Sequence, residues 1–189
     1  RVQARSYEAV TVMFIDFKGF THMAETLSPR HLVGELDYCF RKFDEIVESH
    51  GVEKIKTIGD AYMAASGVPE SSPDHALKMV RAGLDIQQFM NEYARKRSAR
   101  GEPYFEARIG IHSGPIIAGV VGSKKFAYDI WGDTVNTASR LESAGEVGRV
   151  NISQATYLLV KDACICTYRG KIPAKNKGDI DMYFIEWVA

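Results

Sequence analysis

The sequence predicts an α+β fold, a split βαβ sandwich in which helices cover one face of an antiparallel sheet. Short β-branched and aromatic runs alternate with helical periodicities in the order strand, helix, hairpin, helix, strand. The chain has 189 residues, 46% of them hydrophobic, which is enough for one sizeable core. No internal repeat interrupts this order. We therefore expect one domain over residues 1–189, cut from a longer regulated protein.

The first strand and the first long helix follow from two different periodicities. Ala9–Phe17 is a β-branched and aromatic run with Asp16 near its C-terminal end, which predicts a buried strand. Gly19 breaks that pattern. In Pro29–His50 apolar residues recur every three or four positions, which is typical of an amphipathic helix, and Gly51 supplies the stop.

The next segments predict a hairpin and a second long helix. Val52–Thr57 and Ala61–Ser66 are strand-like arms on either side of a tight turn that holds Asp60. Asp74 then begins a helix whose apolar positions run towards Tyr93.

The second half predicts another hairpin and then shorter elements. Phe105–His112 and Ile116–Val121 are strand-like, and the Ser, Gly and Pro at 113–115 predict a turn between them. The remaining predicted elements are helix Gly132–Ser143, strand Val150–Ser153, helix Gln154–Val160, and strands Cys164–Tyr168 and Met182–Trp187 around a loop rich in Lys and Gly.

Charge and cysteine content disfavour several classes of function. The 24 Lys and Arg residues balance 24 Asp and Glu residues, so no net field attracts nucleic acid or an anionic membrane. Cys39, Cys164 and Cys166 form no disulfide framework and lack zinc-ligand spacing, which fits a reducing compartment. No segment reaches the roughly 18 to 20 apolar residues of a membrane span. We expect a cytoplasmic domain, alone or in a membrane-attached protein, that contacts neither membrane nor nucleic acid.

A first candidate site lies in the segment Phe14–Thr21. Here a strand delivers Asp16 and then turns through Gly19 into a helix. Backbone N–H groups at such a helix start can face phosphate oxygens, while the carboxylate binds a metal that bridges them. Taken alone, an Asp beside a turn is more often a helix cap.

A second carboxylate, Asp60, lies in the segment Lys54–Met63. A hairpin beside the first strand would bring Asp60 close to Asp16, and two such acids can hold a pair of Mg²⁺ ions about 3.5 to 4 Å apart. The alternative is an ordinary Gly-Asp turn.

Both segments, together with Asp129–Arg140 and Arg108–Gly114, resemble the class III adenylyl and guanylyl cyclase family over essentially the whole chain. The resemblance implies a ferredoxin-like βαββαβ core with additional C-terminal strands and helices. It also implies a head-to-tail homodimer with composite active sites in the cleft between subunits.

The resemblance assigns roles to residues that match the motifs of the family. Asp16, Asp60 and the carbonyl of Phe17 match the ligands of two Mg²⁺ ions. Mn²⁺ is expected to support activity in place of Mg²⁺. Asn136 and Arg140 match the residues that act on the transition state. Expected nucleotide-binding residues are Lys56, Asp129, Phe17, Gly19, Phe20, Thr21, Lys175 and Arg108.

Lys56 and Asp129 match the pair that reads the purine. Adenine offers an amino donor at N6 and an acceptor at N1, so an Asp with a Lys complements it. Relatives that use GTP resemble one another in placing Glu and Cys, or a residue like Cys, at these two positions. The sequence therefore favours ATP and predicts an adenylyl cyclase that forms cyclic AMP and pyrophosphate. The alternatives are a guanylyl cyclase and a non-catalytic module for dimerisation or nucleotide sensing.

Three further residues are open at this point. Lys175 matches the family lysine that grips the terminal phosphates, but Asn176 replaces a common Gly, so Lys177 remains an alternative. Arg108 matches an arginine near the phosphates, although a strand arginine can also form a structural ion pair. His112 is expected to be structural or to contact the second subunit.

Overall fold

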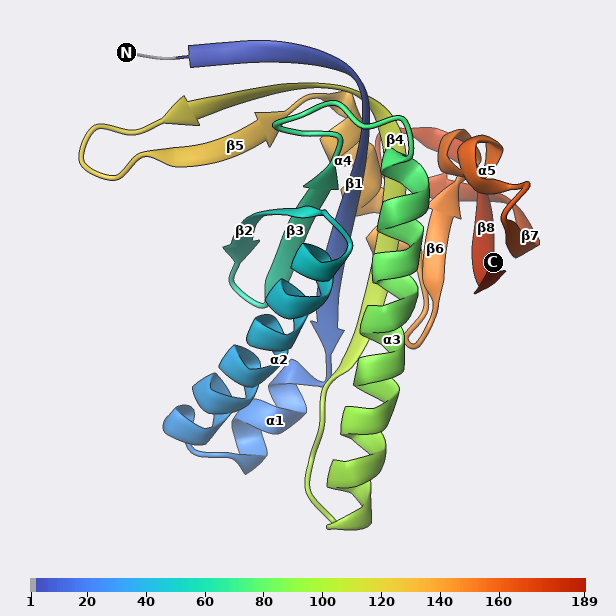
Figure 1. Cartoon of the computed structure of the whole chain (residues 1–189). Coiled ribbons are helices and arrows are strands. Elements are labelled where there is room, and N and C mark those ends of the chain that lie inside the picture. Colours follow the sequence, from blue (N-terminus) through green and yellow to red (C-terminus); the bar gives the residue numbers. More distant parts are fainter. Residues whose placement is uncertain (1–2) are drawn as a thin grey trace.

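Two long antiparallel strands, β1 (Gln3–Lys18) and β4 (Glu106–Val121), form the centre of an eight-stranded sheet in the computed structural model, which describes residues 3–189 (Figure 1). The sheet order is β2-β3-β1-β4-β6-β8-β7, and β5 also pairs with β4. The other strands are β2 (Glu53–Ile58), β3 (Ala61–Ser66), β5 (Ala127–Trp131), β6 (Val150–Ser153), β7 (Cys164–Ala174) and β8 (Gly178–Val188). The helices are α1 (Phe20–Thr26), α2 (Pro29–Ser49), α3 (His75–Ala99), α4 (Asp133–Ser143) and α5 (Gln154–Val160).

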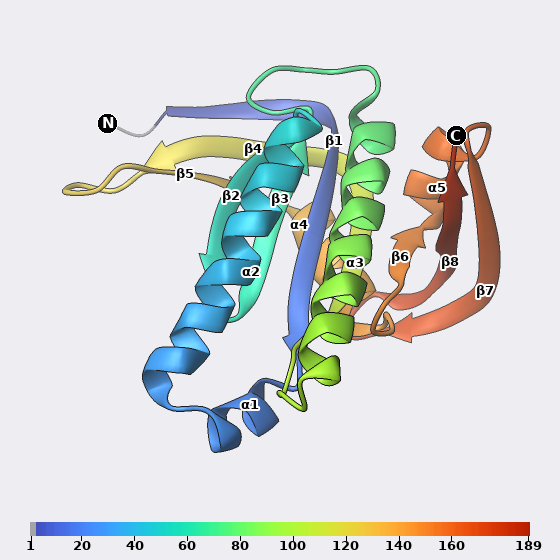
Figure 2. The same ribbon diagram turned by 60° about the horizontal axis from the view of Figure 1, so that its bottom comes forward.

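The two faces of the sheet are covered differently, as Figures 1 and 2 show. Helices α2 and α3 pack on one face, where Met13, Ile15 and Phe17 alternate inward from β1 into the main core. The opposite side chains, Val12 and Phe14, join a smaller core beneath α4. Because α4 covers only part of this second face, polar side chains on the remaining part of the sheet reach the surface.

The α+β class and the ferredoxin-like core are confirmed. The order β4-β1-β3-β2 is the one that a βαββαβ core requires, and the β2–β3 hairpin lies where the sequence predicts it. The long helix α2 ends one residue before the predicted boundary, and α3 continues beyond Tyr93 through the basic cluster to Ala99.

The predicted turn at residues 113–115 is wrong, because β4 runs through it without a break. Gly114 pairs with Val10 of β1, next to a register shift that absorbs the irregularity. The hydroxyl of Ser113 is hydrogen bonded to that of Thr11, 2.8 Å away. These tertiary contacts hold the Ser-Gly-Pro segment extended, and the chain reverses instead between β4 and β5.

Three other details differ from the sequence-based expectation. Helix α4 lies on the face opposite α2 and α3, so the helices do not share one face. The pair β4–β6 is parallel, because the crossover through α4 returns the chain to the same end of the sheet. The Lys- and Gly-rich loop is mostly strand, since β7 and β8 pair from Ala174 and Gly178 outward.

No helix within residues 3–189 is long and apolar enough to cross a bilayer.

Candidate active site

Two carboxylates converge at one end of the β1–β3 pair. Asp16 of β1 lies opposite Ala61, the residue that follows Asp60 in the β2–β3 turn. The turn closes through Gly59, whose φ of 59° is in the left-handed region that suits glycine. Burial raises the pKa of Asp16, and the nearby negative charge of Asp60 raises it further. A cation between the two carboxylates would relieve this repulsion.

The two carboxylates suit a hard cation whose remaining ligands come from water and a phosphate group. Among the described residues there is no cluster of three or more His, Cys, Asp or Glu side chains arranged to hold a metal. Two carboxylates are nevertheless typical of Mg²⁺ sites in which phosphates and water complete the coordination. The ring of Phe17 is buried against Phe105, with centroids 4.7 Å apart, so only its backbone can serve the site.

The turn after Asp16 leads directly into α1. Gly19 adopts a left-handed conformation with φ 86° and precedes Phe20, the first residue of the helix. No side chain caps this helix start. Gly19, Phe20 and Thr21, which the sequence predicts to bind phosphate, therefore follow Asp16 closely along the chain.

Arg108 connects the acidic pair to α4. It lies opposite Asp16 in the β1–β4 register, and its Nη2 is 3.8 Å from Oδ2 of Asp16. The same nitrogen is 2.9 Å from Oε2 of Glu142, a buried residue in the last turn of α4. Burial raises the pKa of Glu142 to about 7, with a further contribution from Asp16. Sequence reasoning missed Glu142, although an acid at a helix C-terminus, where the dipole disfavours it, was an available signal.

Glycine is required where β4 passes under the end of α4. A Cβ on Gly110 would lie 1.9 Å from the backbone nitrogen of Glu142 and 2.4 Å from the carbonyl carbon of Leu141. This close approach fixes the height of the last turn of α4 above the sheet, and therefore the position of Glu142 beside Arg108.

Lys56 and Asp129 meet across two strands that are far apart in the sequence. Nζ of Lys56 on β2 donates to Oδ2 of Asp129 on β5 over 2.7 Å. The other carboxylate oxygen accepts a hydrogen bond of 2.8 Å from the backbone N–H of Ile130, which fixes its orientation. The two residues that resemblance selects as a pair are thus in direct contact.

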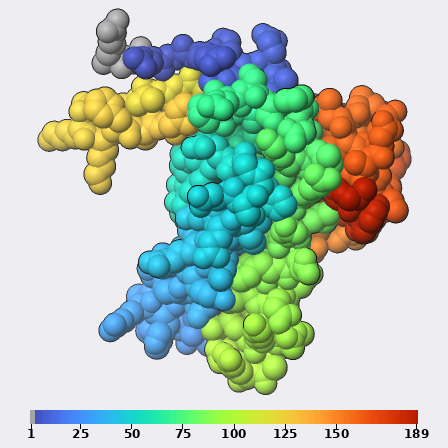
Figure 3. Space-filling model, in the orientation of Figure 1, coloured from blue at the N-terminus to red at the C-terminus, as the bar shows by residue number. Residues whose placement is uncertain are grey.

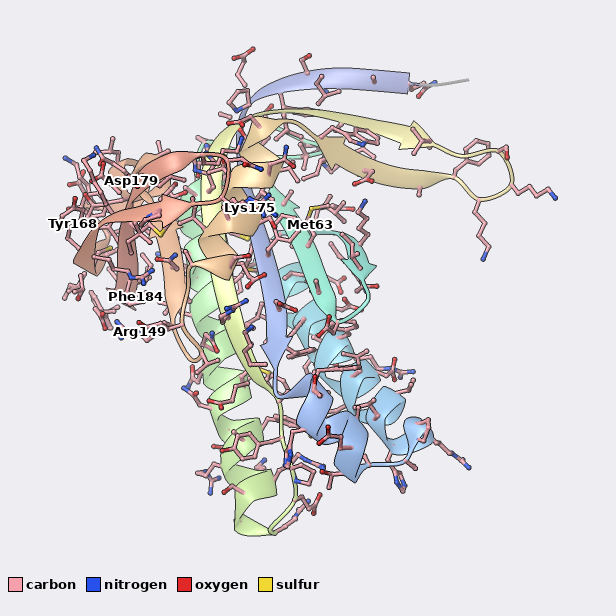
Figure 4. The ribbon with its side chains drawn as sticks, turned by 180° about the vertical axis from the view of Figure 1, so that it is seen from behind. Met63, Arg149, Tyr168, Lys175, Asp179 and Phe184 are labelled. Carbon is pink, nitrogen blue, oxygen red and sulfur yellow. The ribbon has the colours of Figure 1, made fainter. Side chains whose placement is uncertain are left out.

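A groove of about 400 Å³ adjoins this ion pair. Its lining is mainly apolar or aromatic, with a few polar groups, which is the usual composition of a site for an organic ligand. The lining residues are Phe14, Lys56, Ile58, Met63, Ile130, Trp131, Gly132, Val135, Asn136 and Ser139. Figure 4, seen from behind, labels Met63 on the face that carries α4. Phe14 precedes Asp16 by two residues on this same face, so the groove begins roughly 7 Å from the acidic pair.

Asn136 and Arg140 lie one turn apart on α4, but the structure gives them different surroundings. Asn136 is exposed and lines the groove. Arg140 does not line it, and its Nε is buried with no hydrogen-bond partner among the described residues. Nε of Arg108 is unsatisfied in the same way. Buried donors without acceptors are costly in a finished structure and are expected where an anionic ligand completes the site.

The two candidate lysines at the end of the β7–β8 hairpin have different surroundings. Lys177 forms an ion pair with Asp133, the first residue of α4, and this contact lowers the pKa of Asp133. Lys175 is exposed at the hairpin end, where Asn176 has a φ of 63° (Figure 4). Lys177 therefore anchors the hairpin to α4, while Lys175 extends from it.

His112 lies below the start of α4 and makes a structural contact. Its Nδ1 is 2.7 Å from the hydroxyl of Ser153. Burial lowers its pKa to about 4, so the ring is neutral at pH 7. The contact with Ser153 agrees with the expectation of a structural histidine.

Comparison with known proteins places this arrangement in one family. The family model for the adenylate and guanylate cyclase catalytic domain matches residues 2–187. An adenylate cyclase of Mycobacterium tuberculosis is 42% identical over 182 residues, which are 96% of this chain and 40% of the relative. The chain thus spans less than half of that curated relative.

Solved structures of both substrate classes share the fold. The adenylyl cyclase CyaB from P. aeruginosa superposes with a TM-score of 0.91 at 30% identity, covering 99% of this chain and 97% of that one. The guanylate cyclase domain of RhGC from Catenaria anguillulae, in complex with GTP, gives 0.90 at 36% identity, covering 98% and 100%. The chain belongs to the class III adenylate and guanylate cyclase catalytic domain family.

Proposed function

We propose that this domain is an adenylyl cyclase, which converts ATP into 3′,5′-cyclic AMP and pyrophosphate. The observation that carries the choice of ATP is the pair formed by Lys56 and Asp129 beside the groove. Ile130 N–H holds Oδ1 of Asp129, and Oδ2, which accepts from Lys56, has a second lone pair that would accept a hydrogen bond from the N6 amino group of adenine. Lys56 is the matching donor for N1. Guanine reverses this pattern of donor and acceptor and would meet two mismatches.

Asp16 and Asp60 are the residues that would hold two Mg²⁺ ions, with the backbone carbonyl of Phe17 as a further ligand. Such ions, when bound, lower the pKa of an attacking hydroxyl and neutralise phosphate charge. The fit rests on the two facing carboxylates and on the raised pKa of Asp16. These two residues would orient the triphosphate of a nucleotide whose base lies in the groove of a second copy, so that the ribose 3′-hydroxyl can attack the α-phosphorus in line while pyrophosphate leaves.

Cationic and amide side chains would bind the phosphates and the ribose. Arg140 would donate from its unsatisfied Nε to the charge that grows on the transferred phosphate, and Asn136 would hold the ribose. Arg108 and Lys175 would bind the terminal phosphates. Lys175 is preferred to Lys177 because Asp133 already neutralises Lys177.

Two copies of the chain would assemble head to tail, with each site composed of the metal-binding residues of one copy and the purine and transition-state residues of the other. The support is an exposed apolar arm, which consists of the β4–β5 hairpin and projects from the body of the molecule (Figure 3). Phe126 at its tip is 70% exposed, and Ile117, Val121 and Trp131 are also exposed. Contiguous apolar surface of this kind is typical of a protein interface.

The substrate proposal is tested by measuring turnover of ATP and of GTP with Mg²⁺ and with Mn²⁺. We expect ATP to be the preferred substrate of the unmodified domain. In the variant that combines Lys56→Glu with Asp129→Cys, kcat/KM should shift towards GTP, because the donor and acceptor of the pocket are exchanged. A preference of the unmodified domain for GTP would refute the assignment, and no turnover of either nucleotide would favour a non-catalytic module.

The composite site has its own test. Asp16→Ala and Arg140→Ala domains should each be inactive, and mixing them should restore part of the activity through one intact site per heterodimer. Mixing Asp16→Ala with Asp60→Ala is the matched control, since both lesions lie in the same half-site. A proven heterodimer of the first pair that stays inactive would rule out the shared site.

A further inference from the structure

Arg108 lies between two carboxylates, and only one of them belongs to the metal-binding pair. We propose that Glu142 is a positioning residue that holds the Arg108 guanidinium away from Asp16. Asp16 then stays available to a cation, and Arg108 stays available to phosphate. The inference rests on the proposed function, because it concerns the residues assigned there to metal and phosphate.

The sheet register alone would bring Arg108 and Asp16 together. They are direct cross-strand neighbours on the same face, and side chains in that relation usually have Cβ atoms about 4.5 to 5.5 Å apart. An arginine and an aspartate so placed normally close into a tight ion pair. Instead, Nη2 of Arg108 is 3.8 Å from Asp16 and 2.9 Å from Glu142. The guanidinium therefore lies towards α4, beside Glu142.

Glu142 cannot withdraw from this contact. Its side chain is 9% exposed, and its backbone is pressed against Gly110 of β4. A buried carboxylate without a cation is costly, so Glu142 needs Arg108 more than the partly exposed Asp16 does. Lys18 is the other cation that acts on both carboxylates, and it is exposed at the end of β1.

The contact leaves Arg108 able to bind a further anion. Although Nη2 of Arg108 and Oε2 of Glu142 are close, the N–H group is poorly directed, and this oxygen receives no well-formed hydrogen bond. Nε of Arg108 is also buried without a partner. Glu142 thus fixes the place of the guanidinium without using all of its donors.

The inference predicts a specific result for Glu142→Gln. Without the carboxylate, Arg108 is free to pair with Asp16, and a metal ion must then compete with the guanidinium for the same oxygens. Binding of Mn²⁺ to the nucleotide-free protein, counted as free Mn²⁺ by electron paramagnetic resonance, should weaken about tenfold. Glu48→Gln, the same change at an exposed position of α2, is the matched control and should bind as the unmodified protein does.

Removing Arg108 separates this role from a general loss of structure. In an Arg108→Gln background, Glu142→Gln should not weaken Mn²⁺ binding further, because no guanidinium remains to compete. In turnover assays Glu142→Gln should raise the metal concentration that gives half-maximal activity. The change in kcat at saturating metal should be much smaller than this change in metal requirement. Thermal unfolding of each variant checks that the fold persists.

Several outcomes would overturn the inference. The first is Mn²⁺ binding that Glu142→Gln leaves unchanged. The second is a loss of Mn²⁺ affinity on Glu142→Gln that is equally large in the unmodified protein and in the Arg108→Gln background. The third is Mn²⁺ binding to the unmodified protein that does not depend on Asp60. Failure of the proposed function is distinguishable. A domain that prefers GTP, or turns over neither nucleotide, yet shows this dependence of Mn²⁺ binding on Arg108 and Glu142 would refute the adenylyl cyclase assignment alone.

Discussion

The packing of α4 on β4 gives the sharpest prediction from the structure. In Gly110→Ala the new methyl carbon would lie 1.9 Å from the backbone nitrogen of Glu142, whereas non-bonded heavy atoms prefer about 3.5 Å. The end of α4 must therefore lift by roughly 1.5 Å, and neither atom belongs to a flexible side chain that can move aside. Overpacking of this kind costs about 1 to 3 kcal/mol.

Urea unfolding and turnover should be measured together in Gly110→Ala. We expect the free energy of unfolding to fall by about 1 to 3 kcal/mol, and kcat to fall more than the lost folded fraction explains, because α4 also carries Asn136 and Arg140. Gly34→Ala is the matched control. A Cβ there meets nothing within 4 Å, so the change should stabilise α2 by up to about 1 kcal/mol. If Gly110→Ala unfolds within 0.5 kcal/mol of the unmodified domain, the close approach does not exist as described.

Three more predictions concern pH, assembly and phosphate binding. The folded pKa of His112, about 4, lies below its unfolded value of 6.5, so the unfolded chain binds the extra proton and stability falls as pH drops from 6.5 to 4. His112→Gln should lose less stability over that window in urea titrations, and an equal loss would mean that the ring titrates normally. Phe126→Asp should weaken self-association in sedimentation experiments without lowering the thermal midpoint, whereas unchanged association would remove the arm from the interface. Lys175→Ala should raise KM for ATP with little effect on stability, whereas Lys177→Ala should lower the stability of the domain by releasing the hairpin from α4. The opposite pattern of effects in the two variants would show that Lys177 binds the phosphates.

Much of the fold was predictable because local signals agreed with it. The three- and four-residue spacing of α2 and the glycine turn that places Asp60 depend on neighbouring residues alone. Sequence motifs likewise marked Asp16, Lys56 and Asp129 as candidate site residues. The structure adds that Lys56 and Asp129 touch, although 73 positions separate them.

Local signals failed where a distant segment outweighed them. Ser113 and its neighbours have turn composition, yet pairing with β1 and the bond to Thr11 keep them extended. Glu142 has no motif of its own, and it gained a role only because Gly110 lets α4 descend onto the strand that carries Arg108.

The sequence by itself predicted most of the elements in their order and marked Asp16, Asp60, Lys56 and Asp129 as candidate site residues, because periodicity, turn chemistry and motif spacing are written in consecutive residues. Only the tertiary structure decided which lysine is neutralised, which carboxylate holds Arg108, and where the groove lies. Those outcomes depend on strand register and on the approach of α4 to the sheet, and both are set by contacts between residues far apart in the chain.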